Sequence, residues 1–215
     1  MRRFSPFLGA DVVEVGAGIG TFSEFLLSAP QIKSLVAIEP GANTFRHLER
    51  RLASRTNARA VSGYLDDYHA PSSADSLVAV NVLEHVEKDE EFLRAAMDVV
   101  RPGGTLLLFV PAVPAIFGSL DIALEHFRRY TKSELRRRIE AAGWSTEKIG
   151  YMNLPGILSW FVAGKVLRRT SISAFDARVY DRVAVPLTSA IEDMIEMPIG
   201  QSLLAVGRRP SAVTG

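Results

Sequence analysis

The sequence has no cysteine among its 215 residues. This absence excludes disulfide bonds, thiolate metal sites and cysteine nucleophiles together. An excess of one charge is also missing, since 25 basic and 24 acidic residues leave a formal net charge of +1. A protein with so weak an overall field has no general attraction for nucleic acid or an anionic membrane. We therefore expect no nucleic-acid partner, although a local basic patch is not excluded by net charge.

Long hydrophobic runs are missing as well. A membrane-spanning helix needs about 20 apolar residues, and the longest apolar stretch, residues 154–167, is interrupted by a proline, two glycines and a lysine. The first residues show no apolar region of signal-peptide length before a small-residue cleavage site. With 47% hydrophobic and 23% charged residues, the composition is that of a soluble globular protein. We expect a cytoplasmic protein whose residues 1–215 form a single domain.

Strand and helix patterns alternate through the first half of the chain. Buried strands are predicted at 11–15, 34–39, 58–62, 74–82 and 105–110, with a turn at Pro102–Gly104 before the last of them. Helices are predicted at 21–28, around Leu48, and at 89–100. Such alternation favours an α/β fold in which a parallel sheet is covered by helices on both faces.

The second half begins with a looser segment, residues 111–129, which has some helical character. Thr131 and Glu134 then form a capping-box pattern that opens a helix ending at Gly143. A strand at 144–151 and a final strand at 201–208 enclose a helical insertion at 153–197, which we interpret as a lid or an interface.

A glycine-rich turn follows the first predicted strand, with Gly16, Gly18 and Gly20 separated by single residues. Glycine lets the backbone approach a ligand closely because no β-carbon intervenes. The G-x-G-x-G spacing differs from the G-x-G-x-x-G of dinucleotide binders. A tight turn selected for packing is the alternative interpretation of these glycines.

Glu39 ends the second predicted strand, 19 residues after Gly20. A carboxylate at this position can accept hydrogen bonds from the two hydroxyls of a ribose. It could instead stabilise the start of the following helix through the helix dipole. Together with the glycine turn, Glu39 favours a ligand that carries a ribose.

Four spaced segments carry a family resemblance: residues 12–20, 38–40, 80–86 and 100–106. Together they resemble class I S-adenosylmethionine-dependent methyltransferases of the small bacterial type. The resemblance implies a Rossmann-like sheet of seven strands, parallel except for one antiparallel strand near the C-terminus. It also implies S-adenosylmethionine as the methyl donor, with S-adenosylhomocysteine as the product.

The resemblance further implies a set of cofactor-binding residues. Glu14, Gly16, Gly18 and Gly20 would surround the methionine part, Glu39 the ribose, and Asn81, Val82 and Leu83 the methionine and sulfonium. The sequence departs from the family after the third strand, where Tyr64 stands in place of the acid that contacts adenine. Either Asp66 takes over that contact after a shift of the loop, or Tyr64 stacks on the base and the backbone of Leu65 contacts its edge, so we expect Leu65 and Asp66 beside the adenine.

Three residues are candidates for catalysis on the acceptor side: His85, His126 and Tyr130. Histidine titrates near neutral pH and can accept a proton, although His85 could instead have a structural role. His126 and Tyr130 lie in an unusual polar and aromatic segment, in which Arg128 or Arg129 could hold an anionic acceptor or form a solvated pair. No metal site is expected, because only Glu84 supplies a carboxylate near the fourth strand.

The acceptor itself is only partly indicated. Apolar residues at 154–169, followed by arginines, are most simply a packed lid or homodimer face, but they could also contact a membrane surface or a lipid-like acceptor. About ten residues precede the first strand, so the pocket could be open, covered by another subunit, or part of a shortened chain. We predict methyl transfer to a small molecule, lipid-like or sugar-linked. The alternative is a non-catalytic subunit that binds S-adenosylmethionine or a partner.

Overall fold

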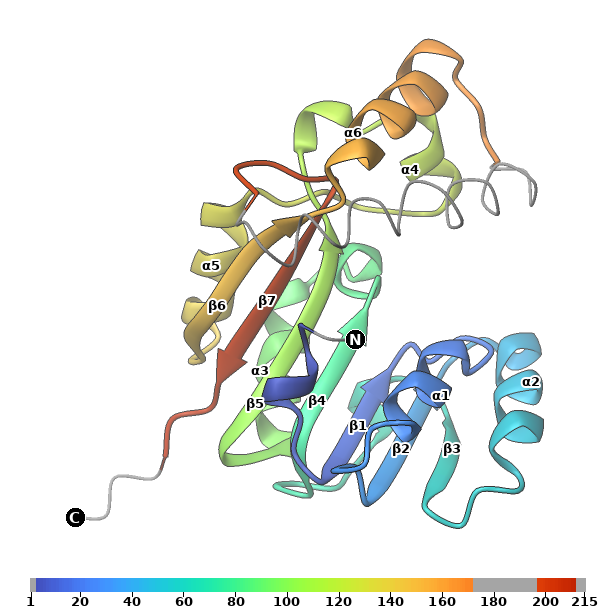
Figure 1. The fold of residues 1–215 in the computed structure, drawn as a ribbon, viewed down its shortest axis with the longest axis vertical. Helices are drawn as coiled ribbons and strands as arrows, with labels where there is room; N and C mark the ends of the chain where they lie inside the picture. Colours follow the sequence, from blue (N-terminus) through green and yellow to red (C-terminus); the bar gives the residue numbers. More distant parts are fainter. Residues whose placement is uncertain (1–2, 172–196, 212–215) are drawn as a thin grey trace.

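The computed structural model describes residues 3–171 and 197–211, and its central feature is a seven-stranded sheet (Figure 1). The strands are β1 (Asp11–Val15), β2 (Ser34–Glu39), β3 (Ala58–Ser62), β4 (Ala74–Val80), β5 (Val100–Pro111), β6 (Ser145–Met152) and β7 (Ser202–Arg208). The α-helices are α1 (Thr21–Leu27), α2 (Ala42–Leu52), α3 (Asp89–Val99), α4 (Ser119–Ala123), α5 (Lys132–Ala141) and α6 (Leu154–Trp160). Short 3-10 turns are η1 (Ser5–Phe7), η2 (Leu65–Asp67), η3 (Leu83–His85) and η4 (Pro114–Ile116), and η5 (Phe161–Val166) is a π-helical turn.

The strand order is β3-β2-β1-β4-β5-β7-β6. Strands β1 to β5 pair in parallel, while β7 runs antiparallel to both of its neighbours, β5 and β6. The predicted Rossmann-like sheet, parallel except for one strand near the C-terminus, is therefore confirmed. The strand order reverses between β1 and β4, and ligands of such sheets bind at the carboxyl ends of the strands at this switch point.

Alternating side chains on each strand form two separate hydrophobic layers. On β1, Val13 and Val15 face a core that includes residues of α3 and α5. Val12 faces the opposite layer, which contains Leu26 of α1, and α2 packs on that same side through Leu48 against Ala37. This period of two gives helices on both faces of the sheet, as predicted.

The start of β5 differs from the prediction. We expected a turn at Pro102–Gly104, whereas the strand begins at Val100 and continues through these residues with a register shift against β4. Gly104 lies so close to β4 that a β-carbon there would collide with the backbone oxygen of Asp75. Gly104 therefore serves close packing at the beginning of the strand, whereas Gly103, with a φ of +80°, has the left-handed backbone typical of a turn.

Helix α5 begins as its sequence predicts, but with half of the capping box. The hydroxyl of Thr131 accepts a hydrogen bond of 3.1 Å from the backbone N–H of Glu134. The Glu134 carboxylate accepts instead from Arg138, one turn along the helix, at 3.2 Å. Gly143 has a φ of +98° and ends the helix as expected for a left-handed terminal glycine.

Beyond the carboxyl ends of β4 and β5 lie two short helices, α4 and α6, which pack together (Figure 1). The hydroxyl of Ser119 in α4 donates 2.9 Å to the carbonyl of Gly164 in η5. Within the described residues, no helix is long and apolar enough to cross a membrane. Of the helical insertion predicted at 153–197, residues 172–196 lie outside the described part of the chain.

Candidate functional site

The glycine turn between β1 and α1 has the backbone conformation that its sequence predicts. Gly16, Gly18 and Gly20 have φ values of +68°, +57° and +82°, a region that L-residues rarely adopt. A β-carbon at Gly16 would collide with Val82, and one at Gly20 would lie 2.9 Å from Leu48. A β-carbon at Gly18 would meet no atom within 4 Å. Gly16 and Gly20 therefore serve protein packing, whereas Gly18 borders open space at the strand end.

Glu39 holds the glycine turn from the end of the neighbouring strand, β2. One carboxylate oxygen accepts a hydrogen bond of 2.8 Å from the N–H of Gly18. The other accepts from the N–H of Gly41 at 2.9 Å and from the hydroxyl of Thr44 at 2.7 Å. Glu39 is therefore fixed beside the open face of Gly18, and it caps the following helix as the alternative interpretation proposed.

Glu14 lies beneath the same turn and is 3% exposed. Its carboxyl oxygen accepts a hydrogen bond of 2.5 Å from the hydroxyl of Ser23. Burial raises the pKa of Glu14 to about 7, against the opposing effect of the Ser23 hydrogen bond. The side chain therefore exchanges a proton close to neutral pH.

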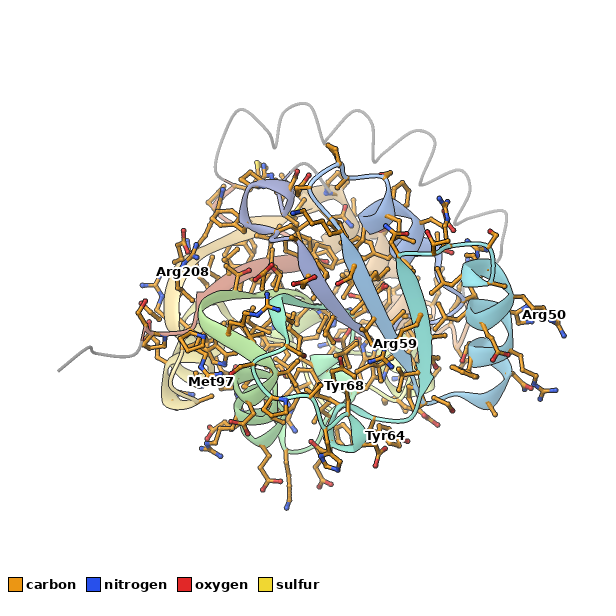
Figure 2. All side chains as sticks on the ribbon, turned by 90° about the horizontal axis from the view of Figure 1, so that it is seen from below. Arg50, Arg59, Tyr64, Tyr68, Met97 and Arg208 are labelled. Carbon is orange, nitrogen blue, oxygen red and sulfur yellow. The ribbon has the colours of Figure 1, made fainter. Side chains whose placement is uncertain are left out.

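At the predicted adenine side, the tyrosine is exposed and the leucine is buried. Tyr64 is 68% exposed and projects from the surface below β3 (Figure 2). Leu65 packs into the main core, whereas Asp66 is exposed. Asp67 accepts a hydrogen bond of 2.9 Å from the backbone N–H of Tyr64. Asp67, and not Asp66, therefore stabilises the turn at residues 64–67.

The segment after β4 approaches the glycine turn. Asn81 has a φ of +53° and an exposed side chain, and its backbone N–H donates 2.8 Å to the carbonyl of Phe109. Val82 is the side chain that a β-carbon at Gly16 would strike. The Leu83 side chain is fully buried in the core, so it lies behind the segment and only Asn81 and Val82 are open to a ligand.

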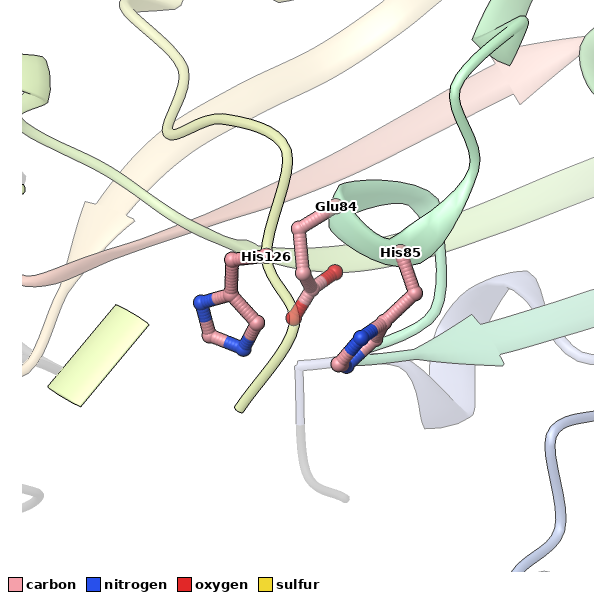
Figure 3. A group of neighbouring side chains, drawn as sticks. All are labelled: Glu84, His85 and His126. Atoms are coloured by element: carbon pink, nitrogen blue, oxygen red, sulfur yellow. The ribbon is translucent and has the colours of Figure 1, made fainter. Parts of the chain in front are cut away.

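Two of the three candidate catalytic residues come together just beyond this segment. His85 in η3 and His126 in the loop after α4 have ring centroids 4.7 Å apart in an edge-to-face arrangement. The carboxyl group of Glu84 lies beside the two rings (Figure 3). One nitrogen or oxygen atom from each of the three residues lies within 4.8 Å of the other two.

The charged and titratable character of this cluster follows from its burial. Glu84 is fully buried, neither of its carboxyl oxygens has a hydrogen-bond partner, and burial raises its pKa to about 8. Partial burial and the neighbouring His126 lower the pKa of His85. His85 is nevertheless exposed, so solvent reaches the cluster from its side.

Asp121 in α4 fixes the position of His126. It is fully buried and accepts hydrogen bonds from the side chains of His126 (3.0 Å), Arg129 (2.7 Å) and Trp160 (3.0 Å). Burial by itself would raise the pKa of Asp121, but these hydrogen bonds and the Arg129 guanidinium outweigh it and keep the pKa below its usual value. The carboxylate therefore stays charged and connects α4, the His126 loop and α6.

Tyr130, the third catalytic candidate, lies elsewhere. It is fully buried, and its hydroxyl is 3.1 Å from the carbonyl of Leu83 and 3.0 Å from the carboxylate of Asp89. Burial and the Asp89 carboxylate raise its pKa. The structure therefore makes Tyr130 a support beneath η3.

The two arginines before Tyr130 are both engaged within the protein. Arg128 donates 3.1 Å to Asp89, and Arg129 is 3% exposed and donates to Asp121 and to the carbonyl of Ala112. The solvated pair considered from the sequence is therefore wrong, because both guanidinium groups satisfy carboxylates in the fold.

Comparison with known proteins finds similarity to methyltransferases. A model of the methyltransferase domain family matches residues 13–106. The ubiquinone biosynthesis O-methyltransferase of Schizosaccharomyces pombe mitochondria is 29% identical over 131 residues, 60% of this chain and 48% of that protein. The enzyme of the same name from Xanthomonas campestris is 25% identical over 178 residues, 77% of this chain and 74% of its own.

Solved structures share the fold. The crystal structure of an S-adenosylmethionine-dependent methyltransferase from Mesorhizobium loti has a TM-score of 0.67 at 13% identity, and the match covers 97% of this chain and 95% of the other. This chain spans about half the length of the Schizosaccharomyces relative. The match to the family domain ends at residue 106, so it covers the glycine turn, Glu39 and His85 but not His126.

Proposed function

We propose that this protein transfers a methyl group to an oxygen atom of a small, apolar acceptor. It has the fold and the family domain of class I S-adenosylmethionine-dependent methyltransferases. The single observation that carries the proposal is the arrangement at the carboxyl ends of adjacent strands. There, the open face of Gly18 and the carboxylate of Glu39 lie on one side of the switch point, and a Glu-His-His cluster lies on the other.

The residues around Gly18 fit the methyl donor. A β-carbon at Gly18 would occupy the one part of the turn that contacts no protein atom, and Glu39 stands beside it with a carboxylate suited to ribose hydroxyls. Asn81 and Val82 bring the end of β4 against the same turn. S-adenosylmethionine, when bound, supplies a methyl group already activated on a positively charged sulfur.

His85 and His126 face the acceptor in this proposal. They bind the acceptor hydroxyl and favour the loss of its proton, which passes to the solvent that reaches His85. The acceptor oxygen then forms the bond to the methyl carbon as the carbon–sulfur bond breaks, and that electron pair stays on sulfur. Because alignment of two reactants contributes about 7–11 kcal/mol, the chief duty of the cluster is to fix the oxygen in line.

An apolar acceptor is supported by the surface beside the cluster. Ile122 of α4 and Leu158 of α6 are 68% and 69% exposed, and the Trp160–Asp121 hydrogen bond joins these helices to His126. Further exposed apolar side chains on the same two segments and their extensions are Leu124, Leu154, Phe161, Val162, Val166 and Leu167. The relatives named ubiquinone biosynthesis O-methyltransferase methylate oxygen, which supports an oxygen acceptor.

Calorimetric titration tests the donor, and mass spectrometry tests the reaction. We expect S-adenosylmethionine and S-adenosylhomocysteine to bind with micromolar affinity, and Glu39→Ala to weaken both at least about tenfold. Phenols and long-chain alcohols incubated with donor and protein should gain one methyl group. Failure to bind either nucleoside at millimolar concentration would refute the proposal, and binding with no turnover across the panel would favour a non-catalytic subunit.

A further inference from the structure

The Glu84–His85–His126 cluster has a feature that methyl transfer alone does not explain. Glu84 is fully buried, yet both of its carboxyl oxygens lack a hydrogen-bond partner. A buried carboxyl with no partner is costly, and such a group calls for an explanation such as an ion that the structure does not contain. These oxygens lie beside two imidazole rings (Figure 3), and neutral imidazole is a common metal ligand.

The two histidines are held in the way that metal-binding histidines are held. A metal-ligating imidazole usually donates its second ring nitrogen to a carboxylate or a backbone carbonyl. Nδ1 of His126 lies 3.0 Å from the Asp121 carboxylate, and His85 is hydrogen-bonded to the backbone of Glu125. Each ring therefore has one nitrogen engaged by the protein, as in such sites.

The spacing is close to that of a coordination sphere. The three ligand atoms lie within 4.8 Å of one another, whereas a tetrahedral ion with bonds of about 2.0–2.1 Å needs about 3.3 Å between ligands. The difference between these distances is at most about 1.5 Å, which small side-chain rotations can close. The exposed side of His85 provides a path by which an ion can enter the site. Arg129 forms its hydrogen-bonded ion pair with Asp121 and acts on Glu84 through its charge without a hydrogen bond, so the Glu84 oxygens remain available to a cation.

We propose that Glu84, His85 and His126 bind a divalent transition-metal ion such as Zn²⁺. Two imidazoles and one carboxylate form a ligand set known from catalytic zinc sites, in which a further position stays open. Imidazole donors favour Zn²⁺ and other transition metals over Mg²⁺. This site rests on the proposed function: the ion held by the two histidines, and not the histidines themselves, would contact the acceptor hydroxyl at its open position, and the hydroxyl would lose its proton more easily.

Co²⁺ titration of the metal-free, tag-free protein tests the site directly, because Co²⁺ at a protein site of low coordination number absorbs visible light. We expect one equivalent of Co²⁺ to bind, Zn²⁺ to displace it, and Mg²⁺ in excess to leave it in place. Glu84→Gln, which keeps the shape of the side chain, and His85→Asn, at an exposed position, should each weaken binding at least about tenfold. His47→Asn, at an exposed histidine on α2, is the matched control and should bind as the wild type does.

Asp121→Asn removes the charge of the carboxylate that holds His126 and should reduce Co²⁺ affinity about 10–100-fold. Far-ultraviolet circular dichroism on every variant separates loss of a ligand from loss of the fold. Absence of the visible spectrum in wild type, or an unchanged spectrum in both Glu84→Gln and His85→Asn, would overturn the proposal. Titration of S-adenosylmethionine into the same samples reports on the proposed function independently, since donor binding without Co²⁺ binding removes only the metal site.

Discussion

Glu14 should make the stability of the protein depend on pH through the physiological range. In the unfolded chain this glutamic acid ionises at its ordinary value of 4.5, whereas burial beneath the glycine turn raises the pKa to about 7 in the folded protein. Between these values the folded state holds a proton that the unfolded state has released. The contribution of Glu14 to stability is therefore complete below pH 4.5 and falls as the pH rises to about 7.

The size of the effect follows from the two pKa values. Each pH unit between them corresponds to about 1.4 kcal/mol, so wild type should lose about 3 kcal/mol across the interval through this one carboxyl. Glu14→Gln keeps the shape and an acceptor oxygen for Ser23 but cannot ionise. The unfolding free energy of the variant, relative to wild type, should therefore increase by about 3 kcal/mol from pH 4.5 to pH 8.

Urea unfolding at a series of pH values measures this difference, because other titrating groups, including Glu84, are present in both proteins and cancel. Glu49→Gln, at an exposed glutamate on α2, is the matched control and should follow wild type at every pH. Parallel curves for wild type and Glu14→Gln would show that Glu14 is already ionised in the folded protein, and the argument from burial would be refuted.

Other substitutions test the remaining parts of the site. Gly18→Ala should lower the unfolding free energy by about 1–2 kcal/mol because of the left-handed backbone, and calorimetry should show that most affinity for S-adenosylmethionine is lost. Gly16→Ala, which adds a collision with Val82, should lower the melting temperature further. Tyr130→Phe should cost about 1–2 kcal/mol of stability and leave KM for the acceptor nearly unchanged. A large increase in KM with unchanged stability would instead show that the Tyr130 hydroxyl contacts the acceptor. Ile122→Ser combined with Leu158→Ser should lower kcat/KM several-fold for apolar acceptors only, and equal losses for polar acceptors would contradict an apolar contact.

The sequence predicts the sheet and its glycine turn well because each depends on local patterns. Short apolar runs define β1, β2, β4 and β5, which are buried over most of their length, and the three closely spaced glycines mark the turn whose backbone has positive φ values. The start of β5 was mistaken because Pro102–Gly104 has the composition of a turn. The close approach of Gly104 to β4 is a non-local contact that the sequence does not reveal, while the positive φ of Gly103 agrees with the expected turn.

The acceptor side was less predictable because its key residues are distant in sequence. His85 and His126 were each recognised as candidates, but nothing in the sequence places their ring centroids 4.7 Å apart or puts Glu84 beside both of them. Asp121 and Trp160 were missed, since a lone aspartate and a tryptophan in an apolar helix have no distinctive pattern. Tyr130 belonged to the same unusual segment as His126, and only the fold shows that its side chain points into the core.

The position of β7 between β5 and β6 has a consequence for how the chain folds during synthesis. Among the strands of the described residues, β6 pairs with β7 alone, apart from a single bridge between Tyr151 and Met197, and β7 is made about 50 residues later. Until then β6 has no neighbour and the free edges of β5 and β6 are open to pairing with other chains. The ribosome must therefore release β7 before the sheet can close, and this late, long-range step is the one most exposed to aggregation.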